Sequence, residues 1–153
     1  MNRNEKAVEA KISLESIPHD LVLEAFVTIE HLSSWWGVST CLIETKPGGI
    51  YSLAWKKNED SFGFVSSGLV RSFHPRQHLL LDKMVYFNPK IDLLGPMSLD
   101  IRIIHDGVTD WLRVMQYGYQ DGADWDWYYE AVRAGWPEAL KNLKSHLSGM
   151  VSE

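Results

Sequence analysis

Alternating apolar and polar residues mark the first element of the chain. From Ala7 to Leu14 every second residue is apolar, beginning at Val8, and charged or small polar residues fill the positions between them. A period of two places one side of a segment in a core and the other side in water. The pattern therefore predicts a half-buried β-strand over Ala7–Leu14.

Two helices are predicted next. Pro18 suits the first turn of a helix, because its missing N–H would have no partner within the helix there. Apolar residues at helical spacing over Val22–Ile29 predict a helix of about three turns. A second, short helix is predicted over Glu30–Trp36. It should end at Gly37, since glycine readily adopts the left-handed conformation that closes a helix.

Strands and short turns fill the middle of the chain. Turn sequences such as Pro47-Gly48-Gly49, His74-Pro75-Arg76 and Asp106-Gly107 separate segments rich in apolar and β-branched residues. Strands joined consecutively by short turns form an antiparallel meander. The six strands predicted in this part of the chain are Val38–Lys46, Ile50–Lys57, Phe62–Phe73, Leu79–Phe87, Met97–His105 and Thr109–Tyr119.

The last predicted element is a long helix over Asp124–Leu147, with Gly149 as its stop. Pro137 lies inside this helix, lacks a backbone donor and crowds the carbonyl of Arg133. We therefore expect a kink near Gly135-Trp136 that joins two straight segments. The apolar positions of the helix, spaced by three and four residues, are Tyr128, Val132, Trp136, Leu140, Leu143 and Leu147.

Together these elements predict an α+β fold. A curved antiparallel sheet of six or seven strands would wrap around the long C-terminal helix, with two short helices after the first strand. Residues 1–153 are expected to form a single domain, because this length can bury one core and no linker or repeat divides the chain. A sheet curled around one helix seals poorly at its ends, so a cavity is expected beneath the helix.

Composition and charge narrow the classes of partner. The chain has seven Trp, six Tyr and five Phe, and tryptophan suits pockets where one ring face stays accessible. The formal net charge of −5 argues against a nucleic-acid partner, which requires a basic surface. No stretch approaches the roughly 20 apolar residues of a membrane-spanning helix. A single cysteine, Cys41, suits a reducing compartment, and we expect a cytoplasmic protein.

The sequence offers little reactive chemistry. Its six histidines are dispersed rather than paired at the spacings of a zinc site. Cys41 lies in a predicted strand, where a buried and inert thiol is the preferred interpretation. There is no Gly-x-Ser-x-Gly turn and no phosphate-binding glycine loop. We therefore predict no catalytic residue, no metal site and no cofactor.

The order of these motifs resembles the helix-grip proteins of the START and Bet v 1-like group, also called the SRPBCC superfamily. Within that group it is most similar to the branch named after the activator of Hsp90 ATPase. The similarity spans nearly the whole chain and implies a helix-grip fold with an internal cavity. The segments that carry it are Trp35-Trp36-Gly37, Lys46-Pro47-Gly48-Gly49-Ile50-Tyr51, Gly68-Leu69-Val70, His74-Pro75, Leu79-Leu80-Leu81 and Gly135-Trp136-Pro137 followed by spaced leucines.

Aromatic residues with a few polar neighbours are the candidate ligand-binding set, since such residues line apolar pockets. In the strand Thr109–Tyr119, either the face with Trp111 and Arg113 or the face with Leu112 and Gln116 could point inward. The candidate residues are Trp35, Trp36, Tyr51, Trp55, Met84, Tyr86, Gln116, Tyr128, Val132 and Trp136.

Three functions follow from the residues and the resemblance. The first is a binding module for a small apolar, aromatic or lipid-like molecule, held between the sheet and the last helix. The second is an enzyme like the polyketide cyclases among helix-grip proteins, and the third is a modulator of a Hsp90-type chaperone ATPase. The third ranks last because those cochaperones have an additional N-terminal domain. A homodimer is a further alternative.

Overall fold

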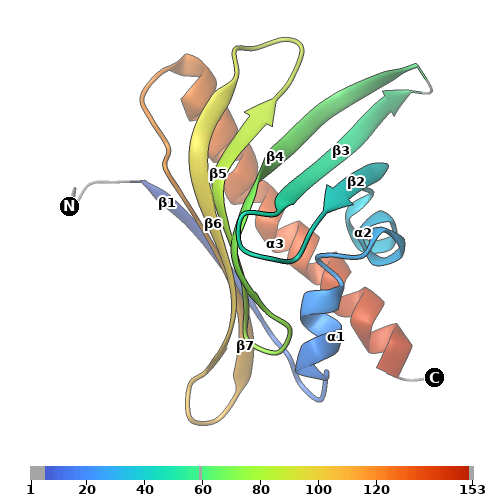
Figure 1. Ribbon diagram of the computed structural model, residues 1–153. Helices are drawn as coiled ribbons and strands as arrows, with labels where there is room; N and C mark the ends of the chain where they lie inside the picture. The colour runs from blue at the N-terminus through green and yellow to red at the C-terminus, as the bar shows by residue number, and fades with distance from the viewer. Residues whose placement is uncertain (1–5, 59, 152–153) are drawn as a thin grey trace.

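The computed structural model describes residues 6–58 and 60–151. One strand, two short helices, six strands and a long helix follow each other along the chain (Figure 1). The bounds are β1 Ala7–Ser13, α1 His19–Glu24, α2 Ile29–Trp36, β2 Thr40–Ile43, β3 Ile50–Asn58, β4 Ser61–His74, β5 His78–Phe87, β6 Leu94–His105, β7 Asp110–Tyr117 and α3 Ala123–Val151.

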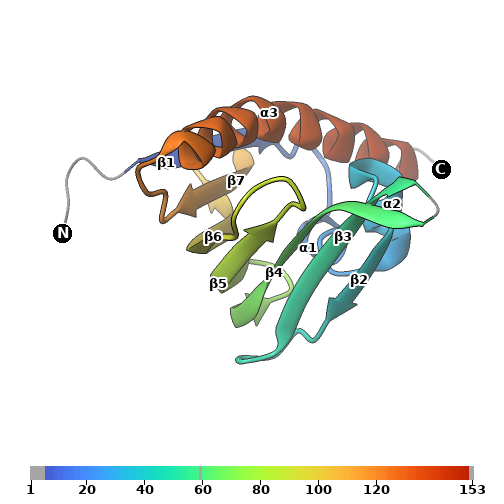
Figure 2. The same ribbon diagram turned by 90° about the horizontal axis from the view of Figure 1, so that it is seen from above.

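The seven strands form one antiparallel sheet in the order β1-β7-β6-β5-β4-β3-β2. Strands β2 to β7 pair consecutively, and β1 closes the far edge by pairing with β7. Helix α3 lies across one face of this sheet (Figure 2). The predicted α+β helix-grip architecture is confirmed.

The curvature of the sheet has a local cause in its register. The pairing shifts between Ser67 and Leu69 where β4 meets β5, and between Leu81 and Met84 where β5 meets β6. Such bulges bend a strand and increase its twist. The sheet therefore curls in its central strands, and its concave side faces α3 (Figures 1 and 2).

The core lies between this concave side and the apolar stripe of α3. Leu140, Leu143 and Leu147 of the helix are fully buried, as are Leu112 and Val114 of β7. Burial of each such side chain stabilises the fold by about 1.5–3 kcal/mol. The inward face of β7 is therefore the one with Leu112 and Gln116, which answers the question that the sequence left open.

The first predicted helix is shorter than expected. Helix α1 ends at Glu24, and Thr28 has extended backbone angles before α2 begins. The carbonyls at this break accept hydrogen bonds from elsewhere in the fold: Trp35 Nε1 donates to Ala25 at 2.8 Å and the Tyr51 hydroxyl to Phe26 at 2.6 Å. These tertiary hydrogen bonds replace the helical hydrogen bonds that the last predicted turn of this helix would have formed. The stop of α2 at Gly37, which has a φ of 71°, is confirmed.

Two expectations for the last helix are wrong. Helix α3 runs without interruption through Pro137 and Gly149 to Val151, and Figure 2 shows one bowed helix rather than two straight segments. Pro137 and Arg133 are both exposed, so the carbonyl that loses its helical donor lies on the side of α3 that faces water. Helices commonly bow with their convex side toward solvent, which spreads the distortion along the helix.

Strand β2 is also shorter than predicted. The two ends of the predicted range form local bonds instead: the carbonyl of Val38 accepts a hydrogen bond from the Ser33 hydroxyl, and the amide of Lys46 donates to the carbonyl of Glu44. In the part of the chain described, no helix is long and apolar enough to cross a membrane.

Candidate functional site

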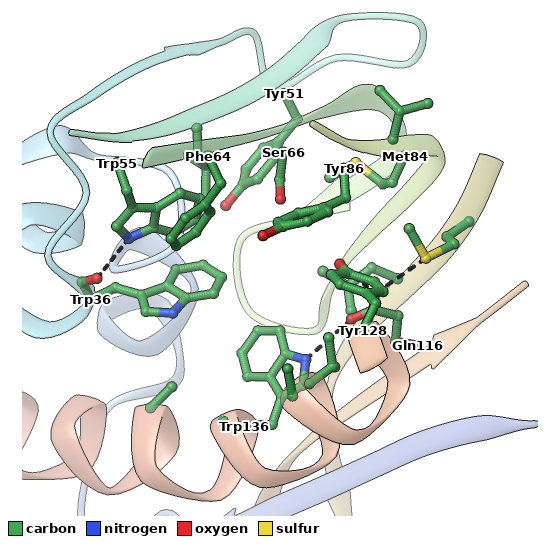
Figure 3. A pocket seen from close by; sticks show the side chains of 18 of the residues that line it. Trp36, Tyr51, Trp55, Phe64, Ser66, Met84, Tyr86, Gln116, Tyr128 and Trp136 are labelled. Carbon is green, nitrogen blue, oxygen red and sulfur yellow. Dashed lines mark hydrogen bonds between the residues drawn. The ribbon is translucent and has the colours of Figure 1, made fainter. Parts of the chain in front are cut away.

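A cavity of about 520 Å³ lies between the concave side of the sheet and α3 (Figure 3). This volume falls in the range of about 300–1,000 Å³ that is typical of small-molecule sites. Strands β3 to β7 supply one wall, α3 supplies the other, and Trp36 at the end of α2 closes one side. The lining residues are Trp36, Tyr51, Leu53, Trp55, Phe64, Ser66, Met84, Val85, Tyr86, Met97, Ser98, Leu99, Gln116, Trp127, Tyr128, Ala131, Val132, Gly135, Trp136 and Ala139.

Nine of the ten residues proposed from the sequence lie around this one cavity. They come from α2, β3, β5, β7 and α3, so segments far apart in the chain converge on it (Figure 3). These nine are Trp36, Tyr51, Trp55, Met84, Tyr86, Gln116, Tyr128, Val132 and Trp136.

Trp35 is the exception. Its side chain is only 3% exposed and does not line the cavity. It lies against Trp36, with stacked rings whose centroids are 4.8 Å apart. Its indole nitrogen donates to the carbonyl of Ala25, so Trp35 belongs to the core that supports the cavity wall.

Trp36 is the centre of an aromatic cluster on one side of the cavity. Its ring centroid lies 5.3 Å from that of Trp55 and 5.1 Å from that of Trp136. Trp55 in turn stacks on Phe64 at 4.7 Å, and its indole nitrogen donates to the carbonyl of Trp36 at 2.9 Å. Helix α2, strand β3 and helix α3 are thus joined through aromatic faces, a contact that contributes about 0.5–1.5 kcal/mol per pair beyond area burial.

Two tyrosines form the opposite side. The ring centroids of Tyr86 and Tyr128 are 4.5 Å apart, which joins β5 to α3. Burial raises the pKa of Tyr128 to about 12 and also raises the pKa of Tyr51. Both phenols are therefore neutral near neutral pH, and they present hydroxyl groups rather than charges.

Gln116 organises the polar part of the cavity. Its amide nitrogen donates to the Tyr128 hydroxyl at 3.3 Å and lies 3.5 Å from the sulfur of Met97. Its side-chain oxygen accepts a hydrogen bond from Trp136 Nε1 at 3.2 Å. Each donor and acceptor of a buried amide needs a partner. Gln116 thereby fixes the orientation of two aromatic side chains of α3 that line the cavity.

The cavity opens beside α3. Trp127 is 50% exposed, and Ala131 and Gly135 are also exposed, yet all three line the cavity. They follow each other at spacings of four and so lie on one stripe of the helix. A Cβ added at Gly135 would meet no heavy atom within 4 Å. The small residues Ala131 and Gly135 leave the mouth open beside Trp127.

The residues that line the cavity but were not proposed from the sequence are mostly small or medium-sized. Phe64 and Ser66 alternate along β4 and face the cavity with the aromatic residues of β3. Ala131, Gly135 and Ala139 recur every four residues in α3. That spacing of small residues was a readable signal for a helix face with room beside it.

Other candidate chemistry lies apart from the cavity. Cys41 is half-buried, and burial, with a smaller effect of the Glu30 carboxylate, raises the pKa of its thiol. Among residues 6–58 and 60–151, no three histidine, cysteine or carboxylate side chains are grouped so that they could hold a metal ion.

A curved antiparallel sheet that encloses a cavity with its C-terminal helix defines a protein of the helix-grip class. The particular family follows from comparison with known proteins. The chain belongs to the family described as Activator of Hsp90 ATPase homolog 1-like protein, which matches residues 16–148. The resemblance seen in the sequence is confirmed.

Solved structures of low sequence identity share the fold. A protein from Nitrosomonas europaea superposes with a TM-score of 0.72 at 15% identity, covering 100% of both chains. A protein from Mesorhizobium loti has a TM-score of 0.70 at 17% identity, covering 94% of this chain and 97% of that chain. The Aha1 dimer from Colwellia psychrerythraea has a TM-score of 0.65 at 12% identity, covering 93% and 96%. No curated protein matches the sequence.

Proposed function

We propose that this protein binds a small, neutral and largely aromatic molecule in the cavity between the sheet and α3. The proposal rests on the chemical character of the side chains that line the cavity. Eight of the lining side chains are aromatic, and every lining residue is uncharged. Pockets of this size and composition commonly enclose most of a small apolar ligand.

The absence of charge from the cavity wall selects against ionised ligands. Moving a charged group from water into an apolar site costs several kcal/mol unless an opposite charge compensates for it. A neutral aromatic molecule instead gains from the removal of apolar area from water and from contact with the faces of Trp36, Trp55 and Trp136.

A hydrogen-bond acceptor on the ligand would find two hydroxyl groups. The Tyr128 oxygen accepts a hydrogen bond from Gln116, and the Tyr86 oxygen accepts one from Asn88 at 3.3 Å. Each hydroxyl keeps its own hydrogen to donate. Their rings are in contact, so a carbonyl or ether oxygen near both could be bound and the aromatic body of the ligand oriented.

Two dyes with one ring system test the proposal. N-phenyl-1-naphthylamine is neutral, whereas 8-anilino-1-naphthalenesulfonate carries a sulfonate on the same rings. We expect the neutral dye to gain fluorescence, quench tryptophan emission and raise the melting temperature, as a ligand of the native state must. The sulfonate should bind at least about tenfold more weakly. Equal binding of both dyes, or of neither, would contradict the proposal.

A pair of glycine variants locates the binding. Gly135→Leu places a side chain at the mouth of the cavity and should weaken binding of the neutral dye, while helix propensity favours leucine. Gly149→Leu is the matched control, because Gly149 is also in α3, also has no heavy atom within 4 Å of an added Cβ, and does not line the cavity. An equal effect of both variants would place the dye elsewhere.

The cyclase alternative receives less support from the cavity. Its titratable lining residues are tyrosines, and the pKa of Tyr128 at about 12 makes that phenol a weak acid near neutral pH.

The chaperone alternative is tested by adding the purified protein to the ATPase assay of a Hsp90-type chaperone. Stimulation of the ATPase rate would support this alternative.

A further inference from the structure

Basic side chains form a row across the outer face of the sheet. In the strand register, Lys11 of β1 lies opposite Arg113 of β7, Arg113 lies opposite Arg102 of β6, and Arg102 lies opposite His78 of β5. Neighbouring strands are about 4.8 Å apart, so the row extends over roughly 14 Å. We call these four residues the basic row.

The basic row points away from the cavity. Leu112 and Val114, on either side of Arg113, are fully buried against the core, and side chains alternate between the faces of a strand. The same alternation holds for Arg102 beside the buried Ile101, and for His78 beside the buried Leu79. Figure 2 shows α3 on the opposite side of the sheet.

Few carboxylates neutralise the row. Asp100, whose side chain is 16% exposed, lies 3.7 Å from Arg102 and 3.6 Å from Arg71, so one carboxylate serves two guanidinium groups. The ammonium group of Lys11 lies over the ring of Trp111 at 4.6 Å. Glu9 precedes Lys11 on the same face of β1 and flanks the row at its edge.

Arg113, at the centre of the row, does not use all of its hydrogen-bond donors. Its Nε atom is buried and has no hydrogen-bond partner among the described residues. Its cross-strand neighbours on both sides are cations rather than carboxylates. Like charges directly opposite each other destabilise a sheet, and local rules of this kind are broken chiefly at functional sites.

The electrostatics of His78 agree with this geometry. Burial lowers the pKa of His78, and the positive charges of Arg102, His74 and Arg71 lower it further, against a smaller opposing effect of Asp100. The outer face of the sheet is thus locally positive in a chain whose formal net charge is −5.

We propose that the basic row is a docking surface for an acidic, carboxylate-rich segment of a partner protein. Carboxylates on successive turns of a helix are about 5.4 Å apart, close to the spacing of the strands that carry the row. Guanidinium groups bind carboxylates in a bidentate geometry. A short acidic segment covers the row alone, whereas a nucleic acid or an anionic membrane would also face the negative remainder of the molecule.

Fluorescence anisotropy with a labelled deca-glutamate peptide tests the proposal. We expect binding by the wild-type protein at low ionic strength that weakens at about 0.2 M salt, because screening acts on exposed charges. The double variant Arg102→Gln/Arg113→Gln should bind about tenfold more weakly, from two charge pairs of up to about 1 kcal/mol each. Arg102→Lys/Arg113→Lys should restore part of the affinity, because it returns the two charges without the bidentate geometry of the guanidinium groups.

The matched control is Arg133→Gln/Lys141→Gln. It removes two positive charges from the exposed side of α3, where each pairs with a glutamate, and it should leave peptide binding unchanged. Equal losses in both double variants, or no binding at low salt, would overturn the proposal. So would tighter binding to phosphatidylserine vesicles or to a single-stranded oligonucleotide than to the peptide. Self-association at low salt that the Arg102→Gln/Arg113→Gln variant abolishes would instead identify a second copy of this chain as the partner.

Discussion

The indole nitrogen of Trp136 donates a hydrogen bond to the side-chain oxygen of Gln116, 3.2 Å away, and so joins α3 to β7 in the wall of the cavity. Gln116 is the one buried side chain in the described part of the protein that is neither apolar nor aromatic. Its amide nitrogen also donates to the hydroxyl of Tyr128, which lies about two turns before Trp136 in α3. A single polar residue of the sheet therefore holds two aromatic residues of the helix in place.

Replacing Gln116 with Leu should destabilise the protein. The substitution leaves the Trp136 N–H buried without an acceptor and removes the donor to Tyr128. An unsatisfied buried group costs about 1–3 kcal/mol. We expect the free energy of unfolding, measured by urea denaturation, to fall by that amount. Binding of the neutral naphthylamine dye should weaken as well, because the two aromatic rings lose their fixed orientation.

A double-mutant cycle separates this interaction from simple loss of packing. Trp136→Phe removes the indole donor, so adding Gln116→Leu to it no longer leaves that donor unpaired. The two costs should therefore be less than additive by about 0.5–3 kcal/mol. Strictly additive losses in the urea experiment would contradict a role for the hydrogen bond.

The alternation and spacing of apolar residues predicted most of the fold, because these periods report directly which side of an element is buried. They could not predict that the first helix ends at Glu24. The apolar spacing continues to Ile29, and the hydrogen bonds that stabilise the shorter helix come from Trp35 and Tyr51, whose positions depend on the folded sheet. Nor could the spacing decide between Trp35 and Trp36, since adjacent residues of a short helix can both contact apolar surroundings.

The cavity was predictable only in part. Large aromatic side chains identified most of its wall, but the mouth is defined by residues that are small. Ala131 and Gly135 carry no aromatic or polar group, so only their spacing of four residues along α3 indicates the open face of the helix. The basic row likewise required the strand register, since its residues come from four strands, and β1 lies far from β5, β6 and β7 in the chain.

Gly68 should be intolerant of a side chain. A Cβ at this position would lie 2.8 Å from the carbonyl oxygen of Asp82 and 2.9 Å from the Cα of Met84, and it would also collide with the Met84 sulfur. The backbone of β5 would have to shift, and overpacking of this kind costs about 1–3 kcal/mol. We expect Gly68→Ala to lower the midpoint of thermal unfolding.

Gly63 in the same strand provides the control. Its added Cβ would meet its nearest neighbour, the carbonyl oxygen of Trp55, at an ordinary 3.6 Å. Gly63→Ala should therefore be neutral, or stabilising by up to about 1 kcal/mol through reduced entropy of the unfolded chain. Similar melting temperatures for the two variants would show that the contact at Gly68 relaxes without cost.

Pro137→Ala should stabilise the protein without changing its ligand profile. Pro137 is exposed within a continuous helix, and alanine would restore a donor for the carbonyl of Arg133. Proline in a helix interior is about 3 kcal/mol less favourable than alanine, so a gain of about 1–3 kcal/mol is expected from urea denaturation. A changed affinity for the neutral dye would instead assign Pro137 a role in shaping the cavity.

A pair of histidines should make stability depend on pH. His31 Nδ1 lies 2.8 Å from His146 Nε2, which joins α2 to α3, and Ser34 Oγ lies 3.2 Å from the other ring nitrogen of His146. One ring must donate and the other accept, so protonation of both would place two N–H groups against each other. Burial lowers the pKa of His146, and the charge of His31 lowers it further.

The sign of the effect follows from proton linkage. A histidine in the unfolded chain titrates at about pH 6.5, whereas His146 in the folded protein binds its proton only at lower pH. Between these two pKa values the unfolded state therefore holds more protons than the folded state. Stability should be constant above about pH 7.5 and fall as the pH drops through about 6.5. The lowered pKa of His78 contributes in the same direction. Loss of stability from Asp106, whose pKa is about 2, belongs to more acidic conditions, below about pH 5.

The variant His146→Gln tests this pH dependence. Its melting temperature should fall less steeply between about pH 7.5 and 5.5 than that of the wild type. Parallel curves for the two proteins would exclude the histidine pair as the cause.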